Sequence, residues 1–242
     1  MLIEDSLSRA VGAKIDKDVK TLYSAHAPLD SATLDLAKYE LEKLNDSPIY
    51  YVDTAGTVDQ IVRTIADFSA QVSKEDGLVV TLDHALLTKG KQSDMEKVII
   101  DDLMRKFVDL KKSFASKGLR IIFVVLTQLN RDIEKPERVT NQFLQYPTRN
   151  DIFASSAVYT CSDYVIITHR PSVVPGMREF YGPPTQLEGK TYPKGLPVYS
   201  PSGQSMVYWH VIKERFGDTK IIPLVEDFKH SRLLTYDSIT NN

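Results

Sequence analysis

The sequence predicts an α/β domain with a mostly parallel central sheet and helices on both faces. Three short apolar runs, at residues 78–82, 120–126 and 164–168, indicate buried strands. Helical patterns stand between these runs. Strands that are apolar along their whole length, in alternation with helices, are typical of a parallel sheet covered on both sides. A chain of 242 residues is long enough for one such domain with a sizeable core, so residues 1–242 are expected to form a single domain.

The first two helices and an edge strand are predicted from spacing and capping signals. Apolar residues recur at helical spacing over residues 34–44, and a short strand is expected over residues 49–52. Thr57, followed three residues later by Gln60, is a capping-box signature. We therefore expect a second helix to begin there, ahead of the strand at 78–82.

The clearest helix is predicted between the strands at 78–82 and 120–126. Ser93 and Glu96 form a second capping-box signature, and an apolar stripe follows that ends at Gly118. The residues of this stripe are Ile99, Leu103, Phe107, Leu110 and Phe114. Their spacing is that of an amphipathic helix with one face in the core.

The later part of the chain has a different texture. Residues 171–206 hold seven of the 12 prolines and five of the 11 glycines, without apolar periodicity. They are predicted to form a long Pro/Gly-rich excursion, a loop insertion that is either functional or merely accessory. Strand patterns return at 206–212 and 220–225, around a turn at 216–218.

Composition excludes several functional classes. The 30 Lys and Arg residues are matched by 32 Asp and Glu, so the chain lacks the basic balance of a free-standing nucleic-acid binder. Any contact with nucleic acid must be local or assembled across subunits. The single cysteine, Cys161, cannot form an intrachain disulfide and favours a reducing, cytoplasmic compartment. No membrane segment is expected, because the longest apolar run, 121–126, is far shorter than the roughly 20 residues that span a bilayer.

Polar residues follow two of the predicted strands. Asp83 directly follows the strand at 78–82, the position where nucleotide-dependent enzymes place a magnesium-ordering group. The alternative is an Asp that caps the next turn, and spacing alone favours that alternative. Gln128 follows the strand at 120–126 and is a candidate sensor of a γ-phosphate. A loop amide that satisfies local backbone groups is the competing interpretation.

Five segments, in this order, resemble the motor domain of DnaB-type replicative helicases and of phage primase-helicases. Residues 47–54 resemble the family's strand-and-turn segment, and residues 79–87 resemble its Walker B strand. Thr127-Gln128-Leu129-Asn130-Arg131 resembles the family's Ser-Gln-Leu-Asn-Arg motif, the most specific of the matches. Residues 151–163 follow the pattern of a further motif, and residues 211–217 resemble the segment that supplies the arginine finger. The resemblance covers nearly the whole chain.

The resemblance implies a RecA-like fold, ATP and Mg²⁺ as cofactors, and a hexameric ring that binds single-stranded DNA. Asp83 would order Mg²⁺ and water, and Gln128 would couple the γ-phosphate to the DNA-facing loops. Lys213 and Arg215 would reach the nucleotide of the neighbouring subunit, where a cation stabilises the charge that develops on the transferred phosphoryl group. A salt-bridged strand end is the alternative for these two residues. Primase or a helicase loader would be a further partner.

The DNA-facing segment departs from the family pattern. Where the family has Arg, Glu and Gly near the DNA backbone, this chain has other residues. Phe153 is a candidate for base stacking, and Ser155 and Ser156 are candidates for phosphate contacts, with core packing as the competing interpretation. Further candidates for phosphate contacts are the arginines that flank the loop between the strands. These are Arg131, Arg138 and Arg149.

One family motif has no counterpart. The sequence contains no Gly-x-x-x-x-Gly-Lys-Ser/Thr, so it offers no Walker A loop for the β- and γ-phosphates. Residues 1–9 align just after the family's catalytic glutamate, which predicts an N-terminally incomplete motor whose partner is the missing N-terminal segment. Negligible ATP hydrolysis is expected from residues 1–242 alone.

Three functions remain open at this stage. The leading hypothesis is part of an ATP-dependent replicative helicase that unwinds duplex DNA by translocating on single-stranded DNA. The alternatives are a non-catalytic RecA-like subunit that contributes Lys213 and Arg215 in trans to a ring, and a RecA-like recombination or regulatory ATPase.

Overall fold

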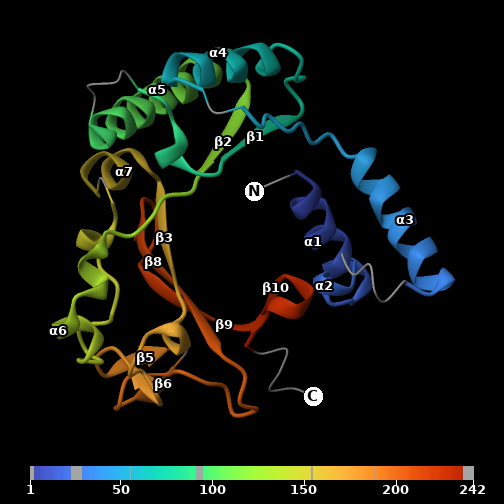
Figure 1. Ribbon diagram of the computed structural model, residues 1–242. Coiled ribbons are helices and arrows are strands. Elements are labelled where there is room, and N and C mark those ends of the chain that lie inside the picture. Colours follow the sequence, from blue (N-terminus) through green and yellow to red (C-terminus); the bar gives the residue numbers. More distant parts are fainter. Residues whose placement is uncertain are drawn as a thin grey trace.

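The computed structural model describes residues 3–22, 29–54, 56–90, 95–153, 155–187 and 189–236 (Figure 1). The α-helices are α1 (Ile3–Ile15), α2 (Val19–Leu22), α3 (Ser31–Asn45), α4 (Val58–Ser69), α5 (Glu96–Ser116), α6 (Pro136–Val139) and α7 (Ser155–Cys161). The strands are β1 (Gly77–Leu82), β2 (Arg120–Val125), β3 (Tyr164–His169), β4 (Phe180–Tyr181), β5 (Thr185–Leu187), β6 (Lys190–Tyr192), β7 (Leu196–Pro197), β8 (Met206–Glu214), β9 (Lys220–Asp227) and β10 (Arg232–Thr235). The 3₁₀ helices are η1 (Ala85–Leu87), η2 (Arg131–Glu134), η3 (Arg149–Asp151), η4 (Pro171–Val173) and η5 (Phe228–His230).

The helices α4 and α5 form a layer over β1 and β2 (Figure 1). At the start of α4, the Thr57 hydroxyl accepts a hydrogen bond from the Gln60 backbone N–H, and the Gln60 side chain accepts one from the Thr57 N–H, which confirms the predicted capping box. The α5 stripe is also confirmed, since Leu103, Phe107 and Phe114 are buried in the main core. The second predicted capping box depends on Ser93, which lies outside the described residues.

The sheet is less parallel than predicted. Among the described strands one pair is parallel, β1 with β2, whereas β3, β8, β9 and β10 form an antiparallel sheet in the order β10-β9-β8-β3. The prediction of a mostly parallel sheet is therefore not supported. The cause is local, because the short turn at 216–218 between β8 and β9 can join only antiparallel neighbours.

The prediction of helices on both faces is wrong for β1 and β2 as the structure describes them. Alternate residues of each strand are exposed on the side away from α4 and α5; Val79 is 62% exposed and Ile122 is 60% exposed. Both faces of these strands are apolar, so the sequence alone cannot distinguish a covered face from an open one. The edge strand predicted at 49–52 is also absent, and these residues are exposed without strand structure.

The 171–206 excursion is more ordered than predicted. It forms two small antiparallel pairs, β4 with β7 and β5 with β6, which pack on β8 and β9. Tyr181 and Leu196 are both 0% exposed. Gly195 has a φ of +94°, and a Cβ there would lie 2.5 Å from the Tyr181 carbonyl oxygen, so this turn needs glycine. Strands of two or three residues give no detectable periodicity, which is why the sequence indicated a loop.

The N-terminal helices lie apart from the sheets. In Figure 1, α1 and α3 stand side by side, and α1 lies close to the η5–β10 end of the chain. Arg232 on β10 holds α1 there by a hydrogen bond to the Ala13 carbonyl and an ion pair with Asp16 at 2.6 Å. No helix in the described part of the chain combines the length and apolar character needed to cross a membrane.

Candidate functional site

Asp83 and Gln128 lie at one edge of the β1–β2 pair. The two strands run parallel in a register that places Leu82 opposite Val125, so both chains leave the sheet at the same edge. Backbone hydrogen bonds continue past the strand ends: Leu126 N–H donates to the Leu82 carbonyl at 3.0 Å, and Ala85 N–H donates to the Leu126 carbonyl at 2.9 Å. The Asp83 and Gln128 side chains are exposed there. The predicted neighbourhood of the acid and the amide therefore exists.

Other polar groups at this edge have spare hydrogen-bonding capacity. The His84 Nδ1 and Thr127 Oγ1 atoms are buried and have no hydrogen-bond partner among the described residues. Buried polar atoms without partners are uncommon in folded proteins and often mark a place where a ligand or a further segment binds. This edge is therefore the best-defined candidate site.

The residues at this edge fit a magnesium–nucleotide complex in part. The described residues contain no group of three acidic, His or Cys side chains that could enclose a metal ion. Mg²⁺ does not need one, because it keeps several waters and binds one or two carboxylates together with substrate phosphates. Asp83 meets that requirement, whereas the sequence supplies no glycine-rich backbone cradle for the phosphates.

A backbone contact joins the Gln128 segment to the predicted DNA-facing segment. Leu129 and Ile152 form an isolated antiparallel bridge, and Phe153 N–H donates to the Gln128 carbonyl at 3.0 Å. Asn130 N–H also donates to the Asp151 carbonyl, at 2.6 Å. Two segments that the sequence separates by more than twenty residues are thus held side by side.

A buried ion pair anchors this arrangement. Asp151 is 2% exposed, and both of its carboxylate oxygens accept hydrogen bonds from Arg138. Thr148 donates to the same carboxylate through its backbone N–H at 2.7 Å and its hydroxyl at 3.0 Å. Burial alone would raise the pKa of Asp151, but the hydrogen bonds from Arg138 and Thr148 outweigh it and the pKa is lowered. Arg138 is therefore occupied inside the protein and does not offer its guanidinium to phosphate.

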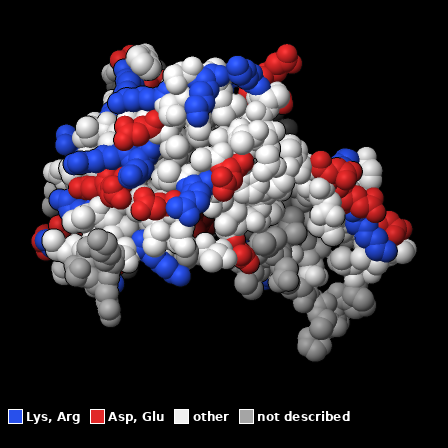
Figure 2. Space-filling view, turned by 90° about the horizontal axis from the view of Figure 1, so that it is seen from above, with Lys and Arg blue, Asp and Glu red and all other residues white. Residues whose placement is uncertain are grey.

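The two other candidate arginines are at the surface. Arg131 opens η2 and is exposed, and the Arg149 guanidinium lies over the Tyr159 ring at 4.5 Å with its outer side exposed. On the face that turns upward in Figure 1, where α4 and α5 lie, Figure 2 shows basic and acidic side chains interspersed. That helical face has no continuous basic patch, so Arg131 and Arg149 remain the better candidates for phosphate contacts.

The remaining DNA-facing candidates divide between core and surface. Phe153 is half-buried and packs against the main core, as the competing interpretation expected. Ser156 is exposed near the start of α7, whereas the Ser155 side chain lies outside the described part. A stacking role for Phe153 stays a prediction that must be reconciled with its packing.

Lys213 and Arg215 have partners within the chain. Lys213 Nζ donates to the Tyr159 carbonyl at 2.5 Å and to the Thr160 carbonyl at 3.2 Å, at the carboxyl end of α7. Burial and the nearby charge of Arg215 lower the pKa of Lys213. Arg215 Nε lies 3.0 Å from a carboxylate oxygen of Asp163. This is the geometry of a salt-bridged strand end, and the contribution of both residues to a neighbouring subunit stays a prediction.

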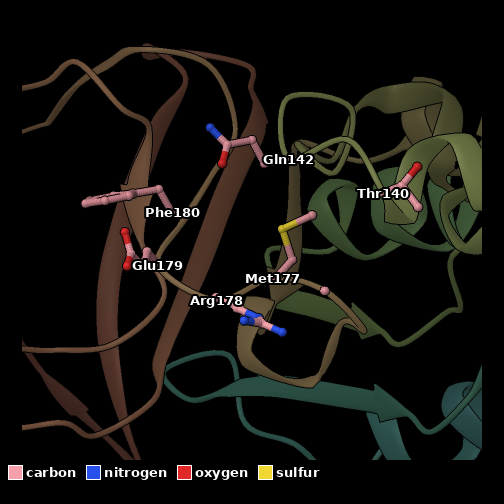
Figure 3. Close-up of a pocket in the computed structure, with 7 residues that line it drawn as sticks. Thr140, Gln142, Met177, Arg178, Glu179 and Phe180 are labelled. Atoms are coloured by element: carbon pink, nitrogen blue, oxygen red, sulfur yellow. The ribbon is translucent and has the colours of Figure 1, made fainter.

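A separate hollow lies on the far side of the loop region. It has a volume of about 330 Å³ and is lined by Thr140, Gln142 and residues 176–180. In Figure 3, Met177 lies between Thr140 on one side and Phe180 on the other. The hollow includes neither Asp83 nor Gln128, so it is distinct from the candidate nucleotide site.

Sequence reasoning missed two features of this region. One is the Arg138–Asp151 ion pair, for which the sequence carries no periodic signal. The other is a cavity of about 250 Å³ between β2 and β3, lined mainly by residues 125–129 and 164–168. The only available signal was the apolar character of both strands.

Comparison with known proteins shows the fold. No protein-family model and no curated protein match the sequence. The structure of a DnaB-like replicative helicase, described with its interactions with primase, matches with a TM-score of 0.70 and 16% identity, over 97% of this chain and 49% of that chain. A second solved structure, of an isolated ATPase domain, matches with a TM-score of 0.71 and 16% identity, over 97% of this chain and 71% of that chain.

The chain therefore shares the α/β fold of helicase ATPase domains. It spans about half the length of the DnaB-like helicase that it matches. This fold agrees with the resemblance of the sequence motifs, which was based on different observations. At 16% identity, the likeness establishes the fold and leaves the activity to be argued from the residues.

Proposed function

We propose that this chain is part of an ATP-dependent replicative DNA helicase motor that works as a hexameric ring on single-stranded DNA. The observation that carries the proposal is the position of Asp83 and Gln128 at the shared carboxyl edge of β1 and β2, in a fold that matches helicase ATPase domains over 97% of the chain. Nucleotides bind at the carboxyl ends of parallel strands in α/β folds. ATP and Mg²⁺ are the proposed cofactors.

Each residue at the edge has a distinct proposed role. The exposed Asp83 carboxylate would hold a water of the Mg²⁺ ion, and the Gln128 amide would contact the γ-phosphate. Because the Gln128 carbonyl accepts a hydrogen bond from Phe153, a shift of Gln128 would move the backbone of the DNA-facing segment. This contact supports a coupling of nucleotide state to DNA binding through one antiparallel bridge.

Arg215 is the better candidate for a residue that acts in a neighbouring subunit. Its side chain is 46% exposed, and its ion pair with Asp163 is a surface contact of the kind that contributes about 0–1 kcal/mol. Exchange of Asp163 for a phosphate would therefore cost little. Lys213 would have to leave two carbonyl acceptors of α7. A primase or a helicase loader is a further proposed partner, since the matched DnaB-like helicase is described with primase.

ATP turnover tests the proposed site. Residues 1–242 alone are expected to show no turnover above background, because the chain has no backbone cradle for the phosphates. In a motor completed with a phosphate-binding segment, Asp83→Ala should lower the Mg²⁺-dependent turnover number by about 100-fold or more, as loss of a group aimed at transition-state charge does. Asp46→Ala, at the exposed end of α3, is the matched control and should leave turnover unchanged.

Two results would contradict this assignment. Magnesium-dependent turnover by residues 1–242 that disappears in Asp83→Ala would show that no further segment is needed. Turnover of a completed ring that is unaffected by Asp83→Ala but lost in Arg215→Ala would favour the non-catalytic subunit that acts only in trans.

DNA binding tests the segment after β2. In the assembled ring, Phe153→Ala should weaken binding of single-stranded DNA by about 1–3 kcal/mol with little change in the salt dependence, if the ring of Phe153 stacks on a base. Arg149→Ala should instead lower the salt slope by about one unit, if its exposed guanidinium meets a phosphate. Titrations of fluorescent oligonucleotide at several salt concentrations measure both quantities. Equal affinity and slope in wild type and both variants would assign this segment a structural role only.

A further inference from the structure

Three strands share an open apolar face. On β1, β2 and β3, one set of alternate residues packs in the main core and the other set is exposed. The exposed set is apolar and includes Val79 (62%), Ile122 (60%), Tyr164 (57%), Ile166 (49%), Leu126 (45%) and Val124 (40%). A contiguous apolar surface of this kind usually marks an interaction site. Single exposed apolar residues would need no explanation, but alternation along three strands does.

The same strands have unpaired edges that border a cavity. β2 is the last strand of the two-stranded sheet and β3 is the last strand of the four-stranded sheet, in the described part of the chain. Between them lies the cavity of about 250 Å³, lined by residues 125–129 and 164–168 together with Ile152, Val158 and Ser162. Thr127 lines this cavity, and its buried hydroxyl lacks a hydrogen-bond partner among the described residues. The cavity thus has both backbone and side-chain groups available for hydrogen bonds.

We propose that this gap receives one β-strand of a strand–loop–helix unit that lies outside residues 1–242, and that the helix of this unit covers the open face. The proposal rests on the proposed function and names the partner of that site. An extended backbone can satisfy the N–H and C=O groups of β2 and β3 together, because each neighbour in a sheet lies about 4.8 Å away. A helix in the gap could not, since its backbone groups are already bonded internally.

The position of the candidate site explains why a helix should follow the strand. A strand that runs parallel to β2 would end beside Asp83 and Gln128, and parallel strands are connected through helices that pack on a sheet face. The amino terminus of that helix would then lie at the edge where phosphate is expected, and helix amino termini bind anions through their free N–H groups. One unit would therefore cover the apolar residues, pair both edges and supply the phosphate cradle.

A second copy of this chain fits the gap less well. It would offer its own β2 and β3 edges, and pairing along one edge would leave the other edge unpaired. The second matched structure, the isolated ATPase domain, supports the chosen occupant, because 97% of this chain accounts for 71% of that chain. The shared fold thus has room for a further segment of substantial size.

Thiol labelling tests the position of the unit directly. Ile122→Cys on the open face and Val98→Cys on α5 are introduced separately into a Cys161→Ser chain; both positions are exposed, at 60% and 52%. The probe is a synthetic polypeptide with a β-branched strand, a Gly-x-x-x-x-Gly-Lys-Thr loop and an amphipathic helix. At saturating probe, the rate of maleimide labelling should fall at least about 10-fold at position 122 and remain unchanged at position 98, with the circular dichroism of both variants equal to that of the parent.

The possible outcomes separate this inference from the proposed function. Unchanged labelling at position 122 in the presence of the probe would overturn the inference. Protection of position 122 without the probe, rising with protein concentration, would also overturn it and assign the face to a second copy. Protection by the probe in a complex that does not bind ATP would support the docking and contradict the proposed function instead.

Discussion

Replacement of Arg138 by alanine is expected to lower the free energy of unfolding by about 3–5 kcal/mol. The change removes both hydrogen bonds from the guanidinium and leaves the Asp151 carboxylate, which is 2% exposed, with Thr148 as its remaining partner. An isolated buried charge is strongly unfavourable. Urea denaturation followed by circular dichroism measures the loss.

Arg149→Ala is the matched control for this prediction. The Arg149 guanidinium is exposed and lies over the Tyr159 ring, so its removal should cost no more than about 1 kcal/mol. Equal losses from Arg138→Ala and Arg149→Ala would contradict the account of the buried ion pair. A second check is the double variant Arg138→Met/Asp151→Leu, which should recover much of the stability, because replacement of both charged partners removes the unpaired charge.

Acid should destabilise the protein through a buried cluster of aromatic and histidine side chains. His169 is 6% exposed and His210 is 1% exposed, and His210 Nε2 lies 2.8 Å from the Tyr181 hydroxyl. Burial lowers the pKa of His169 to about 4 and that of His210 to about 3. The other ring nitrogens, His169 Nε2 and His210 Nδ1, have no partner among the described residues that could accept an added proton's hydrogen bond.

The direction of the pH effect follows from these pKa values. Below about pH 6.5 the unfolded chain binds protons at these rings and the folded chain does not, so stability falls as the pH decreases from about 6.5 toward the folded values. At pH 5 each ring should cost about 2 kcal/mol relative to pH 7. Unfolding free energies from pH 7 to pH 5 measure this loss, and His169→Gln/His210→Phe should flatten the curve. A wild-type curve that is already flat over this interval would contradict the prediction.

Local signals predicted the elements well because their physical causes are local. The Thr57–Gln60 capping box and the apolar stripe of α5 depend on residues a few positions apart, and the structure contains both. The layer structure depended on information that the strands do not carry. Val79 and Val80 are equally apolar, yet the first lies on the open face and the second packs on the core. Exposure of one face can be read only once the covering elements are known.

The candidate site was partly predictable for the same reason. Asp83 and Gln128 each follow an apolar strand, so parallel pairing of neighbouring strands was enough to bring them to one edge. The ion pair of Arg138 with Asp151 joins two points of an irregular loop and has no spacing rule. Lys213 and Arg215 were identified by resemblance, which gave no information about their contacts with α7 and Asp163 inside the chain.

The central claim is that this chain belongs to a motor that separates DNA strands, and strand displacement tests it most directly. The protein completed with its phosphate-binding segment is mixed with a forked duplex that carries a labelled strand, in the presence of ATP and Mg²⁺. The account predicts release of the labelled strand that requires ATP and is lost in Asp83→Ala. Turnover of ATP with no strand release, and with no stimulation by single-stranded DNA, would contradict the assignment to a helicase.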